Sequence, residues 1–160
     1  MSCVVRLKEI NSNDFKELRV LFTRNNIPAI TSFFSPFPLT EETANLICFV
    51  FRKDKFFFAI CNNEIVGFSM LRGWEEGYEV PSFGAFIDYA YQGKGYGKQV
   101  LKLTCDYAKQ IGCTKIRLSV YESNKVALKI YKEYGFQEVS RKSVVLSDRV
   151  DSKIIMIKEL

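Results

Sequence analysis

Residues 88–100 read DYAYQGKGYGKQV and hold three glycines, Gly93, Gly95 and Gly97, within five positions. Glycine at this density is typical of a backbone that turns tightly or approaches a ligand closely. A strand is expected before the glycines and a helix after them, so several backbone N–H groups would point outward at the positive end of the helix. This arrangement favours an anion, best a phosphate or a pyrophosphate. A plain tight turn in front of a helix would explain the same glycines.

Two known phosphate-binding patterns do not fit this segment. The pattern G-x-x-x-x-G-K-[ST] requires Ser or Thr after Gly97-Lys98, where the chain has Gln99. The dinucleotide pattern G-x-G-x-x-G fails because Lys98 or Val100 stands in place of its last glycine. Both nucleotide fingerprints are therefore excluded, while Lys94 and Lys98 still add positive charge beside the glycines.

The residue types that are missing limit the chemistry. The chain contains no histidine, which excludes Ser-His-Asp and Cys-His mechanisms. Proton transfer must then use Asp, Glu, Tyr, Lys or water. Five cysteines lack C-x-x-C spacing, so no metal site is expected, and we expect them to stay reduced as small core residues in the cytoplasm. They are Cys3, Cys48, Cys61, Cys105 and Cys113.

Length and composition predict a single domain over residues 1–160, with 48% hydrophobic and 26% charged residues. The net charge of +5 is compatible with an anionic ligand or simply with a basic surface. Basic residues are scattered among acidic ones, so no nucleic-acid partner is expected. Arg6, Lys8 and Glu9 interrupt the N-terminal segment, and no apolar run is long enough for a bilayer. We therefore expect a cytoplasmic protein without a membrane partner.

The elements that would position the glycines follow from periodicity and turn signals. Helices are expected from residue 12 or 13 to 25, from 40 onward, from 95 or 97 to 111, and from 123 or 124 to 134. Pro28, Pro36 and Pro38 predict a loop over 25–40, and Asn62-Asn63 predicts a hairpin turn. Strands are expected at 3–10, 55–60, 64–71, 79–88, 115–120, 136–146 and 152–160. This order predicts an α+β fold with a mixed sheet.

Two segments resemble a known family. Residues 92–97, QGKGYG, match the Q/R-x-x-G-x-G/A signature of the GNAT superfamily of acyl-CoA-dependent N-acetyltransferases. Residues 124–136, NKVALKIYKEYGF, are similar to the family's N-x-x-A-x-x-x-Y-x-x-x-G-F segment. With the element order, the resemblance covers nearly the whole chain. It implies a mixed, mostly antiparallel sheet flanked by helices, with a V-shaped splay between the fourth and fifth strands.

The resemblance also implies a binding mode for acetyl-CoA as co-substrate. The pyrophosphate would lie on the amides of Gly93–Lys98, and the pantetheine arm would pair with a bulged strand at 85–87. A backbone N–H of Phe86 or Ile87 would polarise the thioester carbonyl. The expected cofactor-binding residues are Ala85, Phe86, Ile87, Gln92, Gly93, Lys94, Gly95, Tyr96, Gly97, Lys98, Asn124 and Tyr131.

Tyr131 stands where the family keeps the acid that protonates the departing thiolate, although packing in the core would explain it too. The base is less well defined. Ser119 and Pro81 occupy the positions where two branches of the family carry a glutamate. Glu79 is the nearest carboxylate and the candidate base, acting through water; the alternative is a solvated residue at the end of a strand.

Two segments, 31–40 and 71–82, are expected to line the acceptor side. Their aromatic rings and carboxylates favour a compact polar amine, either an amino sugar or an amino-acid-like molecule. A loop folded over its own hydrophobic cluster is the alternative. The candidate residues are Phe33, Phe34, Phe37, Arg72, Trp74, Glu75, Glu76 and Tyr78. Alternative functions are acetylation of protein N-termini or lysines, or a silent acyl-CoA-binding module, in a monomer or a homodimer.

Overall fold

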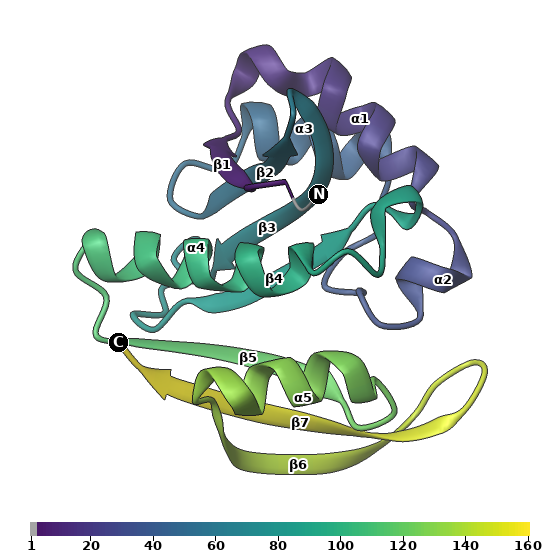
Figure 1. Ribbon diagram of the computed structural model, residues 1–160, viewed down its shortest axis with the longest axis vertical. Coiled ribbons are helices and arrows are strands. Elements are labelled where there is room, and N and C mark those ends of the chain that lie inside the picture. Colours follow the sequence, from purple (N-terminus) through teal and green to yellow (C-terminus); the bar gives the residue numbers. More distant parts are fainter. Residues whose placement is uncertain (1–2) are drawn as a thin grey trace.

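The computed structural model describes residues 3–160, and its main feature is a seven-stranded sheet in the order β1-β2-β3-β4-β5-β7-β6 (Figure 1). The strands are β1 (Arg6–Glu9), β2 (Lys55–Cys61), β3 (Glu64–Arg72), β4 (Ser82–Ile87), β5 (Lys115–Tyr121), β6 (Gln137–Val145) and β7 (Val150–Glu159). All neighbours are antiparallel except β4 and β5. The mixed, mostly antiparallel sheet is thus confirmed.

Helices cover both faces of this sheet. They are α1 (Phe15–Arg24), α2 (Pro28–Thr31), α3 (Glu41–Phe49), α4 (Tyr96–Gln110) and α5 (Lys125–Tyr134). One core cluster joins α1, α2 and α3 to β2, β3 and β4 and contains Phe22, Phe34, Phe68 and Phe86. A second joins α4 and α5 to the opposite face of the sheet. In the described part of the chain, no helix is both long and apolar enough to cross a membrane.

Local signals explain most element boundaries. The β2–β3 hairpin turns at Asn62 and Asn63, whose φ angles are 51° and 63°, as a tight hairpin turn requires. Thr40 caps α3 by accepting a hydrogen bond from the Thr43 N–H. The loop predicted over 25–40 was partly wrong, because Pro28 opens the short helix α2. Proline is well tolerated at the first helical position, where its missing N–H has no intrahelical partner.

The splay between β4 and β5 is also confirmed. The two parallel strands share one register pair, Ser82 with Arg117, and the Arg117 N–H donates to the Pro81 carbonyl at 3.0 Å. Beyond this point β5 pairs only with β7. The expected bulge in β4 is absent, because β4 keeps an unbroken register with β3 from Ser82 to Ile87. The opening therefore arises where pairing ends, and Figure 1 shows β4 and β5 at the junction of the two halves of the sheet.

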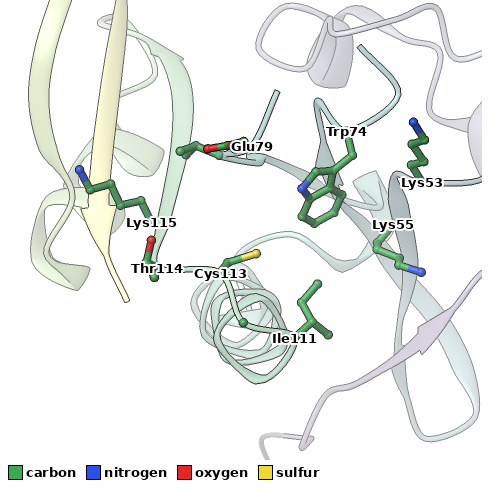
Figure 2. Close-up of a pocket in the computed structure, with 10 residues that line it drawn as sticks. Lys53, Lys55, Trp74, Glu79, Ile111, Cys113, Thr114 and Lys115 are labelled. Carbon is green, nitrogen blue, oxygen red and sulfur yellow. The ribbon is translucent and has the colours of Figure 1, made fainter. Parts of the chain in front are cut away.

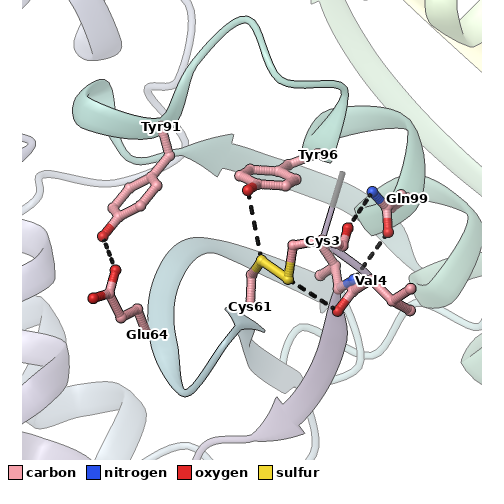
Figure 3. Close-up of a disulfide and its surroundings, with 8 residues drawn as sticks. Cys3, Val4, Cys61, Glu64, Tyr91, Tyr96 and Gln99 are labelled. Carbon is pink, nitrogen blue, oxygen red and sulfur yellow. Dashed lines mark hydrogen bonds between the residues drawn. A yellow bond between two sulfur atoms is a disulfide. The ribbon is translucent and has the colours of Figure 1, made fainter. Parts of the chain in front are cut away.

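The prediction that all cysteines are reduced was wrong for one pair. Cys3 and Cys61 form a disulfide with a Cα–Cα distance of 6.0 Å (Figure 3). Antiparallel pairing of β1 with β2 brings the start of one strand beside the end of the other. The Tyr96 hydroxyl lies 3.5 Å from the Cys61 sulfur, linking this bridge to the first residue of α4. Cys48, Cys105 and Cys113 are free thiols.

A reductant should destabilise the wild-type protein. The bridge closes a loop with a sequence separation of 58 residues, and such a cross-link restricts the unfolded chain. Dithiothreitol should lower the free energy of unfolding by about 2–4 kcal/mol, measured by urea denaturation. Cys61→Ser should abolish this response, whereas the control Cys113→Ser should retain it. Finding all five cysteines as free thiols in protein unfolded without reductant would contradict the bridge.

Candidate active site

A cavity of about 960 Å³ lies at the splay between β4 and β5. Its walls come from both halves of the sheet: β4 and the glycine loop on one side, β5, β7 and α5 on the other. All the residues expected to bind the cofactor line this cavity except Lys94. The Lys94 ammonium lies 5.7 Å from the centre of the Tyr91 ring, and Tyr91 itself lines the cavity.

The three glycines of the loop do not all have the same structural reason to be glycine. Gly93 and Gly95 have φ angles of 79° and 80°, which side chains disfavour. Gly97 lies within α4 and has no positive φ. A Cβ on Gly97 would meet no atom within 4 Å. Neither conformation nor packing against the described residues thus explains Gly97, and it borders open space where a ligand can approach the backbone.

The amides around these glycines are available to an anion. Gly95 is the N-cap of α4, and no side chain caps this end of the helix. The first N–H groups of an α-helix have no acceptor within the helix, and they carry the positive end of its dipole. The exposed Lys98 adds a cation in the same first turn. The loop thus has the donors and charge that a pyrophosphate requires.

A buried carboxylate holds the start of this loop in place. Asp88, fully buried, accepts hydrogen bonds from the Asn25 Nδ2 and the Ala90 N–H, both at 2.9 Å. Its other partner is Arg24, whose Nε lies 2.9 Å from the carboxylate. Asn25 in turn accepts the Tyr89 N–H at 3.0 Å. Because a buried charge is stable only when it is paired, these contacts fix the loop to the end of α1.

Tyr131 lies on the α5 side of the cavity. Its ring makes edge-to-face contacts with Phe83 and Phe136, with centroids 6.1 and 6.0 Å away. Burial raises the pKa of Tyr131 to about 12, so its hydroxyl is protonated at neutral pH. This hydroxyl makes no hydrogen bond to any residue in 3–160. It is therefore a free donor at the wall of the cavity.

Asn124 combines two roles at the start of α5. Its side-chain oxygen accepts the Ala127 N–H at 3.4 Å and so caps the helix, while the residue also lines the cavity. At the other end, Gly135 adopts a φ of 106° and terminates α5. The second motif of the sequence thus places both Asn124 and Tyr131 at the same wall.

The residues expected on the acceptor side separate into groups. Phe33, Phe34, Arg72, Glu76 and Tyr78 line the cavity. Phe34 is also a core residue with 6% exposure, its ring 5.0 Å from that of Phe86. The loop therefore packs on its own aromatic cluster and still presents one edge to the cavity. Phe37 packs against the same cluster and does not line the cavity.

Glu75 lies away from the cavity and holds a turn. Its carboxylate accepts the backbone N–H groups of Arg52 at 3.1 Å and Asp54 at 2.8 Å, and also that of Lys53. Asp54 reciprocates by accepting the N–H groups of Gly73 and Glu75, both at 3.1 Å. These bonds tie the segment before β2 to the connection after β3.

Glu79 and Trp74 line a separate cavity of about 470 Å³ (Figure 2). None of its lining residues lines the larger cavity. Figure 2 shows Trp74 beside Ile111 and Cys113, which follow α4, with Glu79 at the far side. Trp74 packs against the second core cluster, which contains residues of α4 and α5. Arg72, shortly before it in the chain, instead contacts the ring of Phe37, which packs against the first cluster, that of α1–α3. The structure therefore places Glu79 and Trp74 on a different cavity from Tyr131.

Several polar lining residues were missed from the sequence, among them Ser82, Arg117, Tyr121 and Lys153. A signal for two of them existed. In β5 the buried Ile116, Leu118 and Val120 alternate with Arg117, Ser119 and Tyr121. This alternation predicts a polar face on β5, but which cavity that face lines depends on how the strands pair.

Comparison with known proteins identifies the class of protein. The model of the acetyltransferase (GNAT) family matches residues 21–136, well over half of the 160 residues. The chain belongs to the acetyltransferase (GNAT) family.

Curated relatives match part of the chain. A spermine/spermidine N(1)-acetyltransferase of Bacillus subtilis is 37% identical over 81 residues, which cover 46% of this chain and 53% of that protein. A thialysine N-epsilon-acetyltransferase of Bos taurus is 33% identical over 55 residues, 34% of this chain and 32% of that protein. The chain thus spans at most about half the length of these relatives.

Solved structures match nearly the whole chain. The spermidine N-acetyltransferase of Vibrio cholerae, in complex with CoA and spermine, has a TM-score of 0.81 at 20% identity and covers 98% of this chain and 95% of that one. RimL, a ribosomal L7/L12 α-N-protein acetyltransferase in complex with coenzyme A, has a TM-score of 0.82 at 15% identity, with coverages of 99% and 96%. At these identities the likeness shows a shared fold.

Replacing Gly97 should separate folding from ligand binding. Gly97→Asp should change the unfolding free energy of the unliganded protein by no more than about 1 kcal/mol, because a Cβ at this position meets no atom within 4 Å and an acidic residue suits the first turn of a helix. It should weaken coenzyme A binding at least about tenfold, because its carboxylate would lie at the anion site and repel the pyrophosphate. Denaturation and calorimetric titration give the two quantities. Lys109→Ala, at the far end of α4, is the control. Undiminished coenzyme A affinity in Gly97→Asp would exclude the glycine loop as the pyrophosphate site.

Proposed function

We propose that this protein transfers the acetyl group of acetyl-CoA to the primary amine of a small polar molecule. The observation that supports this most directly is Gly97, which neither its conformation nor its packing requires and which borders the same cavity as Tyr131. Membership of the acetyltransferase (GNAT) family and the small amines named in several relatives agree with this reaction.

The glycine loop and β4 would bind the co-substrate. The amides of residues 93–98 would hold the pyrophosphate, with Lys98 as counter-charge. From Phe83 onward, β4 has no strand on the edge that faces β5, so Ala85 and Ile87 can pair with an extended pantetheine arm. Asn124 would contact this arm from the facing wall. These residues would place the thioester at the splay, beside Tyr131.

Groups of this chain would then stabilise the charges that develop as bonds form and break. Acetyl-CoA supplies a thioester, whose carbonyl carbon forms a bond to the amine nitrogen while the carbon–sulfur bond breaks. The backbone N–H of Ile87, which lies on the free edge of β4, would donate to the carbonyl oxygen and stabilise its growing negative charge. The Phe86 N–H points toward β3 in the unbroken register of the two strands. The Tyr131 hydroxyl would donate a proton to the departing sulfur.

The amine must lose a proton before or during attack, and the cavity favours this step without a dedicated base. Arg72, Arg117 and Lys153 line the acceptor half. Positive charges nearby disfavour an ammonium group and lower its pKa, so water can accept the proton. Among the described residues that line the cavity, Glu76 carries the single carboxylate, which lies 3.9 Å from the Arg72 guanidinium. Glu79 opens on the other cavity and takes no part in this proposal.

A screen for released thiol tests the function. Purified protein and acetyl-CoA would be mixed with amino acids, amino sugars and their phosphates, polyamines and short peptides, and kcat/KM would be measured for each. We expect a small amine to be the best acceptor. Peptides with a free N-terminus or lysine that exceed it tenfold in kcat/KM would overturn the small-molecule proposal.

Removal of the Tyr131 hydroxyl should slow the chemical step. Tyr131→Phe keeps the ring packing against Phe83 and Phe136 but removes the proton donor, so kcat should fall by about 10²-fold or more. The KM for acetyl-CoA should change little. Tyr134→Phe is a matched control, since Tyr134 lies on the same helix and does not line the large cavity. Equal losses in the two variants would assign Tyr131 a packing role.

The pH profile should lack an alkaline decline caused by Tyr131. Because burial raises its pKa to about 12, the phenol remains protonated and able to donate up to about pH 10. The value of kcat/KM should therefore rise with pH as the amine loses its proton, and then level off. Tyr131→Phe should lower the whole curve without moving its midpoint. A decline centred below about pH 10 in the wild type and absent in Tyr131→Phe would contradict this assignment.

A further inference from the structure

We propose that the acceptor carries an anionic group, a carboxylate or a phosphate, and that Arg72, Ser82 and Arg117 bind it at the end of the cavity where β4 and β5 are still paired. This inference rests on the proposed acetyl transfer and narrows its substrate class. It predicts that amino acids or amino-sugar phosphates are preferred over polyamines and neutral amines.

The register of three neighbouring strands places these side chains in one row. Arg72 of β3 pairs with Ser82 of β4, and Ser82 pairs with Arg117 of β5. Residues directly opposite each other on adjacent strands project from the same face. With strands about 4.8 Å apart, the two arginines flank the serine hydroxyl closely enough for both guanidinium groups to reach one anion.

The row lies on the acceptor side of the sheet. Ser82, Gly84 and Phe86 alternate along β4 with the residues of its other face, and Phe86 belongs to the core cluster beneath α1–α3. All three residues of the row line the large cavity. The loop after α2 lies above them, since the Pro36 carbonyl accepts a hydrogen bond from the Arg72 guanidinium at 3.4 Å.

The charges of the row are poorly compensated. Arg117 is half-buried and has neither an ion-pair partner nor a side-chain hydrogen bond within residues 3–160. Arg72 has only a weak pair with Glu76, 3.9 Å away and 61% exposed. Among the described residues that line the cavity, the cationic ones are Arg72, Lys98, Arg117 and Lys153, and the carboxylate of Glu76 is the single anionic group. A half-buried arginine without a partner, as Arg117 is, is best explained by an anionic ligand, which Arg binds through its planar donor fork.

The charge of the row also disfavours cationic acceptors. A polyamine would bring further positive charges against Arg72, Arg117 and Lys153, and like charges in a cavity repel.

The test compares matched acceptors in the thiol-release assay. One arm pairs α-amino acids with their carboxamides, another pairs glucosamine 6-phosphate with glucosamine, and spermidine represents the polyamines. In the wild type, an anionic amine should exceed its neutral counterpart by about 10- to 100-fold in kcat/KM, the worth of a charged hydrogen bond. The arm with the larger ratio of anionic to neutral kcat/KM shows whether the site prefers a carboxylate or a phosphate. Neutral amines or spermidine performing equally well would overturn the proposal.

Variants assign the effect to the row. Arg117→Gln should remove most of this ratio, chiefly by raising the KM of the anionic acceptor. Because both acceptors of a pair share the amine chemistry, the ratio cancels any effect of the lost charge on the amine itself. Lys115→Gln changes the charge of the same strand but lines the smaller cavity, and should retain the full ratio. A ratio that persists in Arg117→Gln would refute the role of this residue.

A binding measurement keeps this inference separable from the proposed function. With coenzyme A at saturation to occupy the glycine loop, succinate and inorganic phosphate would be titrated calorimetrically into wild type, Arg117→Gln and Lys115→Gln. We expect one of the two anions to bind the wild type and Lys115→Gln, and to bind Arg117→Gln at least about tenfold more weakly. Absence of binding to the wild type would refute the anion site. Absence of coenzyme A binding would instead refute the proposed function.

Discussion

The site depends on one constraint, the early end of pairing between the parallel strands β4 and β5. These strands share the pair Ser82–Arg117 and then separate, while β5 continues in register with β7 over its full length. Continued pairing would close the cavity and occupy the free edge of β4. The separation instead lets residues of both sheet faces, Tyr131 from one and the row of Arg72, Ser82 and Arg117 from the other, line the same space.

Specific contacts hold the two diverging halves in position. At the glycine loop, Asp88 ties the end of β4 to α1 through Arg24 and Asn25. At the far side, Arg149 from the β6–β7 connection donates to the Ser32 carbonyl at 2.8 Å. Its guanidinium lies between the rings of Phe33 and Tyr121, at 5.2 and 5.1 Å, which joins the loop after α2 to β5.

Arg149 is itself held by a carboxylate. Its Nε lies 2.7 Å from Asp151, and the hydrogen bond from Arg149, together with one from Ser123, holds the pKa of Asp151 well below its usual range. The carboxylate therefore stays ionised at neutral pH and balances the charge of Arg149. Arg117 has no comparable partner among residues 3–160, which distinguishes a structural arginine from one available to a ligand.

The sequence predicted what depends on short stretches of chain. The Asn62-Asn63 turn, the helix starts at residue 40 and at 123 or 124, and the glycine-fronted helix all follow from neighbouring residues. The structure has them where expected, with Thr40 and Asn124 as the N-caps. The sequence did not predict the Cys3–Cys61 bridge, the separation of Glu79 and Trp74 from the cavity, or the row across β3, β4 and β5. Each of these depends on strand register or on the path of a connection, which involves residues far apart in sequence.

The most direct test of the account is a crystal structure with a bisubstrate compound in which the coenzyme A sulfur is joined through an acetyl spacer to the nitrogen of an α-amino acid. The account predicts the pyrophosphate on the amides of Gly93–Lys98, the sulfur beside the Tyr131 hydroxyl, and the carboxylate between Arg72 and Arg117. A compound bound with its pyrophosphate away from the glycine loop, or with its sulfur outside the splay between β4 and β5, would contradict it.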